Sequence, residues 1–447
     1  MLKNLLNPNL FLALILVAGF WVRLYKIDNP IADWHSWRQA DTAAVTRNFF
    51  KYGLDVLHPR YDDFSDVRGN ESFNPQGYRF VEFPIFNLIH YSLTALFPFK
   101  PLEYWGRMIS ILAALTSALF IYLIASKRAN TSTGLLASAI YLLLPYNIYF
   151  TRVILPDPLM VTFFLAALYA HEAKKKILSV LLGASAILIK PMAVFFLLPI
   201  IFTNFWFGLI MLLPFGLWRL WSFRFPQGVP ASLWLLNGNK IRFKGAFFYW
   251  IFGKRLGTLI LGRWGIFPFT LGLSAMEGFW PWALGAGLYL FTFATGNVQH
   301  GYYQLPIIPI VAILISLGAH NFASTITKKI IVLVCLLFMI AFSWYEIRGN
   351  YQINHWGIIH AGQAADKLLP KDAIVIAPYD GDTAFLYQIN RRGFPSIPLP
   401  INELIKNYGV QYYVSVNYDD QTNAVIKTYT VLEKTPEYVI VKLVKKS

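Results

Sequence analysis

The sequence predicts a polytopic α-helical membrane protein with about 11 spans, followed by a small α/β domain after residue 348. Three observations predict this fold class. Of the 447 residues, 56% are hydrophobic and 14% charged, whereas a soluble globular chain carries roughly 25% charge. Apolar runs long enough to cross a bilayer recur through the first 346 residues, and the mean hydropathy is +0.47. Beyond about residue 350 the pattern becomes that of short alternating helices and strands.

The apolar runs define the expected membrane spans. The first run, Leu10–Trp21, has no small-residue cleavage site after it, so we expect it to be retained as a span. The two runs around Lys190 are short, and they form two spans, one long kinked helix or a re-entrant pair. We expect spans at roughly 9–27, 104–126, 133–150, 156–173, 177–190, 192–205, 206–220, 258–275, 279–295, 304–320 and 329–346.

Short basic clusters set the expected orientation. Lysine and arginine residues at 127–128, 174–176 and 328–329 fall on one side of the predicted bundle, which is then cytoplasmic. The opposite, external side receives the remaining loops and the tail: about 28–103, 152–158, 221–257, 296–303 and 349–447.

The tail is expected to be an external, soluble α/β domain of its own, separate from a transmembrane domain that spans residues 1–348 and includes the first loop. We therefore expect it to be dispensable for folding of the membrane part, and to shield the site or dock an acceptor. Its predicted elements are a helix at Ile358–Leu369, strands at Ala373–Ala377, Val410–Val416 and Tyr438–Val444, and a helix at Leu404–Tyr408.

Cysteine usage and charge exclude some classes of function. The single cysteine, Cys335, excludes intramolecular disulfides and cysteine-rich metal sites. The net charge of +16 does not indicate nucleic-acid binding on a chain this apolar. It is typical of basic cytoplasmic loops and of sites that face lipid phosphates.

The first external loop holds the densest group of candidate catalytic and binding residues. A carboxylate beside a lipid surface can serve as general base toward a hydroxyl, and an arginine can bind a phosphate through two hydrogen bonds. The alternative is a solvated loop held by salt bridges. The candidates are Asp33, His35, Arg38, Asp41 and Glu82.

The external turn between the third and fourth spans carries Arg152 and Asp157. Pro156 and Pro158 flank Asp157 and fix the direction of its carboxylate. The alternative is that Asp157 serves as an ordinary N-cap of the following helix.

Two further segments supply cations and aromatic rings. Lys190 lies near the external end of a membrane segment, where an ionisable residue indicates function; the alternative is snorkelling to the interface. His300 can hydrogen-bond a phosphate or a sugar. Tyr302 and Tyr303 either contact the substrate or belong to an interfacial aromatic belt.

The order of these motifs resembles the bacterial branch related to protein O-mannosyltransferases and lipid A aminoarabinose transferases, which are glycosyltransferases of the C-type membrane fold. The resemblance covers about residues 1–346. It is carried by Trp37–Thr42, Glu82–Pro84, Arg152–Pro158, Leu188–Pro191 and His300–Pro306.

The resemblance implies transfer of a hexose or pentose from a polyprenyl-phosphate donor to an external glycan, lipid or protein acceptor, in one inverting step. The enzyme is expected in the plasma membrane (the bacterial inner membrane) with its active site on the external face. The better-known relatives have an adjacent Asp-Glu pair where this chain has Arg38-Gln39. The resemblance implies an acidic base in the first external loop, and we expect it to be Asp33 or Asp41, with a preference for Asp33 because it is nearer to the first span.

We further expect Arg38, Lys190 and His300 to form one cationic pocket for the donor phosphate, with no metal or other cofactor. The alternatives are a lipid or small-molecule transporter (flippase) and a non-catalytic scaffold. A transporter favours repeated halves and ionisable residues at the midplane, and a scaffold gives no reason for the composition of the first loop.

Overall fold

The computed structural model describes residues 7–69 and 72–445, which form two compact units. The first unit contains the chain up to Ile27 together with Gly106–Arg219 and Ser232–Asn350. The second contains Asp28–Trp105, Leu220–Ala231 and the chain from Tyr351 onward. The first unit is a bundle of helices, and the second combines two loop helices with a five-stranded sheet.

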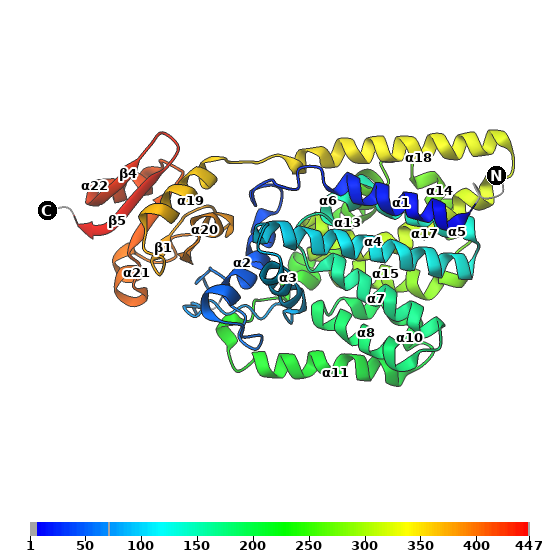
Figure 1. Ribbon diagram of the computed structural model, residues 1–447, viewed down its shortest axis with the longest axis horizontal. Helices are drawn as coiled ribbons and strands as arrows, with labels where there is room; N and C mark the ends of the chain where they lie inside the picture. The colour runs from blue at the N-terminus through cyan, green and yellow to red at the C-terminus, as the bar shows by residue number, and fades with distance from the viewer. Residues whose placement is uncertain (1–6, 70–71, 446–447) are drawn as a thin grey trace. The chain divides into compact units, whose positions relative to one another are not determined.

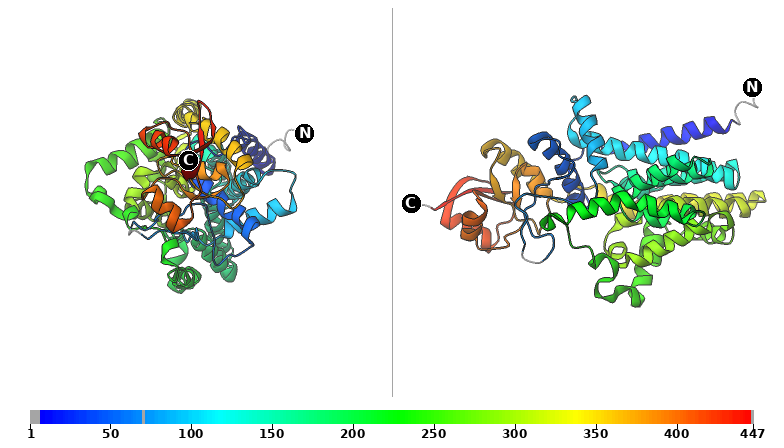
Figure 2. Two further views of the ribbon diagram at one scale, coloured as in Figure 1. Left: turned by 90° about the vertical axis from the view of Figure 1, so that its left-hand side faces the viewer. Right: turned by 90° about the horizontal axis from the view of Figure 1, so that it is seen from below.

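The helices of the first unit run side by side, as both ribbon views show (Figures 1 and 2). The long ones are α1 (Pro8–Arg23), α4 (Leu102–Arg128), α5 (Thr131–Leu143), α7 (Asp157–Glu172), α8 (Lys176–Ile189), α11 (Phe205–Ser222), α15 (Trp280–Thr292), α17 (Ile308–Phe322) and α18 (Ile326–Ile347). The shorter ones are α6 (Pro145–Phe150), α9 (Ala193–Phe196), α10 (Leu198–Ile201), α12 (Trp234–Asn237), α13 (Gly245–Phe248), α14 (Ile266–Leu273) and α16 (Ala294–Gln299). Segments of 3-10 helix and one π-helix join them. They are η3 (Gly238–Phe243), the π-helix η4 (Tyr249–Ile260), η5 (Glu277–Phe279), η6 (Gly301–Ile307) and η7 (Arg348–Tyr351).

Every predicted span contains helix, but many of these helices are short. Among the described residues, four helical stretches are long and apolar enough to cross a membrane: Leu102–Arg128, Phe205–Ser222, Gly301–Phe322 and Ile326–Tyr351. The other predicted spans hold shorter or interrupted helices. The expected span at 133–150, for example, breaks at Pro145, since proline cannot donate the backbone hydrogen bond that would continue α5.

The chain around Lys190 does not form two continuous spans. Helix α8 ends at Ile189, and Lys190 itself is extended, with φ −152° and ψ 125°. Pro191 accounts for this, because the residue before a proline is restricted to extended conformations. Only the four-residue helices α9 and α10 follow. The expected span at 192–205 is therefore not a single helix, and Lys190 lies at a helix end.

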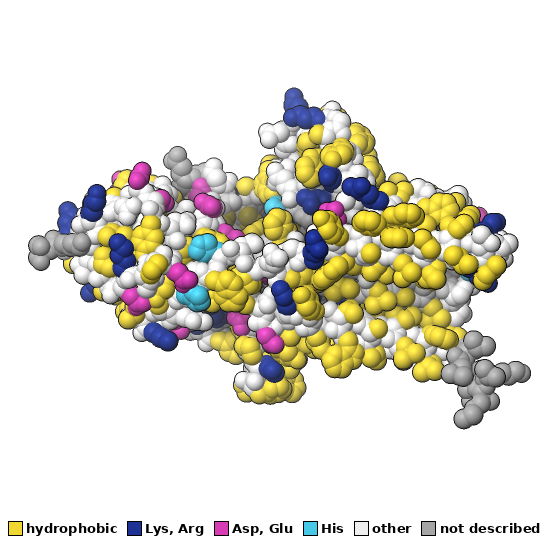
Figure 3. All heavy atoms as spheres, turned by 90° about the horizontal axis from the view of Figure 1, so that it is seen from above, with side chains coloured by type: hydrophobic (Ala, Val, Ile, Leu, Met, Phe, Trp, Pro, Cys, Tyr) yellow, Lys and Arg dark blue, Asp and Glu magenta, His cyan; other side chains and the backbone are white. Residues whose placement is uncertain are grey.

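The first unit has the surface and the packing of a membrane bundle. Hydrophobic side chains cover the face along which α18 runs (Figure 3), among them the exposed Leu333, Leu337 and Phe338. Inside the unit, α14 and α17 cross closely, because a Cβ at Gly272 would lie 1.8 Å from the Leu314 carbonyl oxygen. Small residues that allow such close contact are typical of membrane helix interfaces.

The second unit is built on a mixed sheet. Its strands are β1 (Ile374–Ile376), β2 (Arg392–Phe394), β3 (Tyr412–Ser415), β4 (Tyr429–Lys434) and β5 (Val439–Lys445), in the order β2-β1-β3-β5-β4. Strand β1 pairs in parallel with β2 and β3, whereas β5 pairs antiparallel with β3 and β4. The helices are α2 (Ser36–Tyr52), α3 (Ile85–Leu96), α19 (Gly357–Leu368), α20 (Ala384–Ile389), α21 (Ile401–Tyr408) and α22 (Asp420–Thr428), with a single turn η2 at Pro226–Gly228.

The first loop and the tail share one hydrophobic core. Phe64 of the loop packs in the cluster formed by the sheet residues Ile376, Phe394 and Val439, and its backbone N–H donates to the Gly393 carbonyl at 2.8 Å. The Gly393 N–H donates in turn to the Asp62 carbonyl at 2.9 Å. The contacts thus group the first loop with the tail, which differs from the expected division that placed the loop with residues 1–348.

The elements expected in the tail are confirmed: α19, β1, α21, β3 and β5 fall where the sequence pattern places them. The sequence pattern did not indicate α20, α22, β2 or β4. Strand β2 has only three residues, one of them a glycine with φ 154° whose added Cβ would lie 1.8 Å from the Val375 carbonyl oxygen. Such a strand exists because β1 pairs with it, and its sequence alone does not favour it.

Candidate functional site

Helix α2 carries the candidates of the first loop. His35 precedes it in a left-handed conformation, with φ 53°, and turns the chain so that the Ser36 N–H donates to the Asp33 carbonyl at 3.2 Å. Asp33 therefore lies just before the helix, and Arg38 and Asp41 lie on its first turns. All three side chains are buried, and His35 is half-buried.

The Asp33 carboxylate is oriented by its own helix. The Gln39 side-chain amide donates to Asp33 Oδ1 at 2.6 Å, and Asp33 is only 1% exposed. Gln39 is one of the two residues that stand where the relatives have their Asp-Glu pair. In this chain an amide from that position fixes a carboxylate that lies six residues earlier.

The Asp41 carboxylate is held on both oxygens. An Arg79 guanidinium nitrogen lies 2.9 Å from Oδ2, and the Thr383 hydroxyl donates to Oδ1 at 2.6 Å. Burial raises the pKa of Asp41, while Arg79 and the Thr383 hydrogen bond oppose that rise. The result is a buried carboxylate in one fixed orientation.

Arg38 and Glu82 form an ion pair with each other. The Arg38 side chain is 4% exposed and that of Glu82 is 10% exposed. The alternative of a solvated loop is therefore wrong in one respect: ion pairs are present, but they are buried. Beside the pair is a small pocket lined by Thr42, Val45, Pro59, Arg79, Glu82, Pro84 and Asn87.

Two more acids of this unit have perturbed pKa values. Burial raises the pKa of Asp63 to about 6, against the hydrogen bonds from Ser65. Burial also raises the pKa of Asp382 to about 6, and the nearby Asp41 charge adds to the rise. Asp382 belongs to the tail, which we expected to shield the site or to dock an acceptor. Sequence reasoning missed Arg79, Asp382 and Thr383, since no local pattern marks them.

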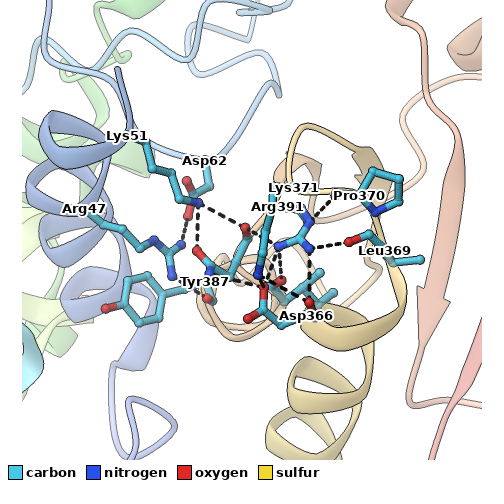
Figure 4. Close-up of polar contacts among 11 residues, drawn as sticks. Arg47, Lys51, Asp62, Asp366, Leu369, Pro370, Lys371, Tyr387 and Arg391 are labelled. Carbon is cyan, nitrogen blue, oxygen red and sulfur yellow. Dashed lines mark hydrogen bonds and ion pairs between the residues drawn. The ribbon is translucent and has the colours of Figure 1, made fainter. Parts of the chain in front are cut away.

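A polar network joins α2 to the tail (Figure 4). Arg47 donates to the Asp62 carboxylate at 2.5 Å and to the Tyr387 carbonyl at 2.8 Å, and its guanidinium lies 4.0 Å from the centre of the Tyr387 ring. Lys51 donates to the Asn390 side chain at 2.7 Å. Arg391, fully buried, donates to Asp366 at 2.7 Å. This network fixes the tail residues that precede β2 against α2.

In the first unit, Lys190 and Asp157 form a buried ion pair at 2.8 Å. The Lys190 ammonium also lies 5.4 Å from the centre of the Tyr302 ring and 5.7 Å from that of Tyr303. The alternative that Lys190 snorkels to the interface is therefore wrong. The N-cap alternative for Asp157 is wrong too, because Pro156 occupies the cap position and Asp157 is the first helical residue.

His300 lies against both tyrosines. Its ring centre is 5.7 Å from that of Tyr302 and 5.6 Å from that of Tyr303. The tyrosines are buried, so the aromatic-belt alternative is wrong for them. Burial, reinforced by the charges of Arg255 and Lys190, lowers the pKa of His300 to about 4. The imidazole is therefore neutral near pH 7, and cannot act there as the cation that we expected.

Arg152 donates hydrogen bonds to backbone carbonyl groups near the end of α1. It is fully buried and donates to the Lys26 carbonyl at 2.5 Å, just beyond the end of α1. Arg107 donates to the Ile27 carbonyl, and Arg23 to the Leu142 carbonyl. Buried arginines thus satisfy backbone carbonyls at the end of α1 and in the chain beside it. Arg152 therefore stabilises the backbone near the end of α1, and its expected part in substrate binding stays a prediction.

The predicted site residues thus form two groups. Asp33, His35, Arg38, Asp41 and Glu82 belong to the second unit, and the others, Arg152, Asp157, Lys190, His300, Tyr302 and Tyr303, belong to the first. Of the expected cationic pocket, Lys190 and His300 share the tyrosine cluster of the first unit. Arg38 pairs with Glu82 in the second. Within residues 7–69 and 72–445, no three His, Cys, Asp or Glu side chains are grouped as a metal ion would require.

Comparisons with known proteins support the expected resemblance. Residues 84–222 match the family model described as dolichyl-phosphate-mannose-protein mannosyltransferase. A comparison with curated protein sequences finds no match.

Solved structures share the fold over most of the chain. ArnT from Cupriavidus metallidurans bound to undecaprenyl phosphate has a TM-score of 0.66 and 16% identity, covering 97% of each chain. The Archaeoglobus fulgidus oligosaccharyltransferase has a TM-score of 0.58 and 11% identity, covering 90% of this chain and 69% of its own. The same archaeal enzyme, AglB, in complex with an inhibitory peptide and a dolichol-phosphate, has a TM-score of 0.55 and 10% identity, with the same coverage. The family match over residues 84–222 and the shared fold support the resemblance: this chain has the C-type membrane fold of the glycosyltransferases to which it is similar.

Proposed function

We propose that this enzyme transfers a sugar from a polyprenyl-phosphate donor to an acceptor on the external face of the plasma membrane, in one inverting step. The proposal rests on two buried carboxylates, Asp33 and Asp41, each of which is oriented by hydrogen-bond donors from other side chains. The fold shared with structures bound to undecaprenyl phosphate or dolichol-phosphate supports the class of donor.

The chemistry is a single displacement. The acceptor hydroxyl oxygen attacks the anomeric carbon from the face opposite the phosphate, while the bond between that carbon and the phosphate oxygen breaks. Asp33 or Asp41 takes the hydroxyl proton as general base, and the polyprenyl phosphate leaves with the bonding electrons. The leaving group is already an anion, so cationic side chains can stabilise its added charge.

Both acids meet the first requirement of a general base, which is a fixed position. Asp33 accepts from a neutral amide, Gln39. Asp41 is paired with a cation, Arg79, although burial still raises the pKa of Asp41. A raised pKa brings a carboxylate nearer to the value that suits a base at neutral pH. We propose both as candidates, and their amide variants distinguish them.

We propose that Lys190 binds the donor phosphate. An ammonium carries three N–H donors, which is enough to bind Asp157 and a phosphate oxygen together. Asp157 holds the lysine in place, and the Tyr302 and Tyr303 rings favour a cation beside their faces. The Arg38–Glu82 pair orients the second unit's cluster and is a further candidate for contact with the substrate.

The test is transfer by the purified protein. Incubation with a panel of polyprenyl-phosphate sugars, with water or an added hydroxyl compound as the acceptor, should release polyprenyl phosphate, and NMR of the product should show inverted anomeric configuration. The Asp33→Asn/Asp41→Asn double variant is the control and should be inactive. Absence of release with every donor, together with movement of labelled lipid across proteoliposome membranes, would instead support the transporter alternative.

A further inference from the structure

The Thr383 side chain of the tail contacts Asp41, one of the two candidate bases. Thr383 precedes α20 and is 8% exposed, and its hydroxyl donates to Asp41 Oδ1 at 2.6 Å. The two residues are 342 positions apart in the sequence. The Trp37 carbonyl, 3.3 Å away, is a weaker second acceptor for the same hydroxyl.

Hydrogen bonds at both ends of α20 fix the position of Thr383. The Asp382 carboxylate accepts from the Ala384 N–H at 2.7 Å, which fixes the start of α20. At the other end of that helix, the Tyr387 carbonyl accepts from Arg47 of α2 at 2.8 Å. Gln388 donates to the Ile31 carbonyl at 3.0 Å. Helix α20, which follows Thr383, is thus hydrogen-bonded to Ile31, before Asp41 in the sequence, and to Arg47, after it.

We propose that Thr383 is a positioning residue for Asp41: its hydroxyl fixes one carboxylate oxygen while Arg79 fixes the other, so that the tail completes the catalytic cluster. This inference rests on the proposed function, with Asp41 as a candidate base. The tail then has a direct part in transfer, in place of the shielding or docking role expected from the sequence.

The hydrogen bond also sets the acidity of Asp41. A donor to a carboxylate stabilises its charged form and lowers its pKa, and Thr383 is one of the groups that lower the pKa of Asp41. Loss of the hydroxyl therefore raises that pKa, and the base becomes protonated at a higher pH. The charged and titratable groups that face Asp41 are Arg38, Tyr61, Asp62, Asp63, Arg79 and Asp382.

The test compares Thr383→Val with Thr383→Ser in the full-length protein. Valine has the shape of threonine without the donor, and kcat should fall about 10-fold or more, in line with the strength of hydrogen bonds to charged groups. The KM for the donor should change little, and the acid limb of the kcat–pH profile should move to higher pH. Thr383→Ser keeps the donor and should restore both kcat and the pH profile.

Two controls separate this role from general stability. Thr422 is a second buried threonine of the tail, and its hydroxyl lies 2.7 Å from Tyr413 Oη. It belongs to α22 and is remote from α20 in the sequence. Thr422→Val should leave kcat and the pH profile unchanged. In an Asp41→Asn background, Thr383→Val should have no further effect.

The outcomes are distinct. An active wild type, an inactive Asp41→Asn variant and a normal Thr383→Val variant would overturn the inference and leave the proposed function intact. Normal activity of Asp41→Asn would overturn it as well, and would leave Asp33 as the base. A wild type that is inactive with every donor would overturn the proposed function itself, and with it the inference.

Discussion

The two clusters of candidate residues differ in how their charges are held. In the first unit, Lys190 is paired with one acid, Asp157, 33 positions away, and its ammonium also lies beside the rings of Tyr302 and Tyr303. In the second unit, each of the carboxylates Asp41 and Glu82 is paired with an arginine, and a threonine from the tail adds a donor to Asp41. The lysine cluster of the first unit is suited to bind one anion. The cluster of the second unit is suited to hold several carboxylates in fixed orientations.

The two clusters also depend on different parts of the chain. The lysine cluster is assembled from motifs that lie within the predicted membrane part. The carboxylate cluster needs α2 and the tail together, since the loop shares its core and its hydrogen bonds with the sheet. Perturbing the tail should therefore affect one cluster and leave the other.

The largest effect is expected from truncation after Asn350. The loop would lose Thr383, the core contacts of Phe64 and the backbone bonds to β2. We expect transfer to become undetectable and residues 28–105 to become sensitive to protease, while the helices of the first unit stay protected. Limited proteolysis with mass spectrometry measures this. A protected loop in the truncated chain would mean that it folds without the tail.

Amide variants of the two candidate bases should differ sharply. An amide cannot accept the proton, so one of Asp33→Asn and Asp41→Asn should lower kcat by about 10²–10⁴-fold, and the other should have a weaker effect. Donor binding should survive in both, because a carboxylate is not needed to hold an anionic phosphate. The measurements are kcat and donor affinity. Equal and small losses in both variants would show that neither acid is the base.

Lys190→Ala should damage the first cluster in two ways. It leaves Asp157 buried without its partner, which costs about 3–5 kcal/mol of stability, and it should weaken donor binding. The Lys190→Met/Asp157→Asn variant, which has neither charge, should regain thermal stability but not donor affinity. Thermal unfolding and donor titration separate the two effects. Normal donor affinity in the double variant would remove Lys190 from the phosphate site.

The smallest effect concerns His300 and pH. Its folded-state pKa of about 4 lies below the ordinary 6.5, so above pH 6.5 the group adds nothing to pH dependence. As the pH falls from 6.5 toward 4, the unfolded chain takes up a proton that the folded chain does not, and stability falls. His300→Phe should make the loss of Tm over this range shallower. The same substitution at the exposed His320 is the control, and a steeper slope in His300→Phe would contradict the assignment.

The fold class of the molecule and most of its candidate residues could be predicted from local sequence patterns. Long apolar runs can satisfy their backbone only as helices in a membrane, so composition and spacing are enough to predict the helical bundle. The tail elements with clear periodicity, such as α19 and β5, were predicted for the same kind of local reason. The residue before Pro191 was restricted locally as well, and Lys190 is indeed at a helix end.

The pairing of the charged side chains depends on the folded chain and could not be predicted. Local patterns cannot show that Arg38 pairs with Glu82, that Lys190 pairs with Asp157, or that Thr383 donates to Asp41. These pairs form because burial makes an uncompensated charge costly, so each buried carboxylate is satisfied by whichever donor the fold brings beside it. The tail and the first loop form one unit because they share a hydrophobic core, although more than 200 residues separate them in the sequence.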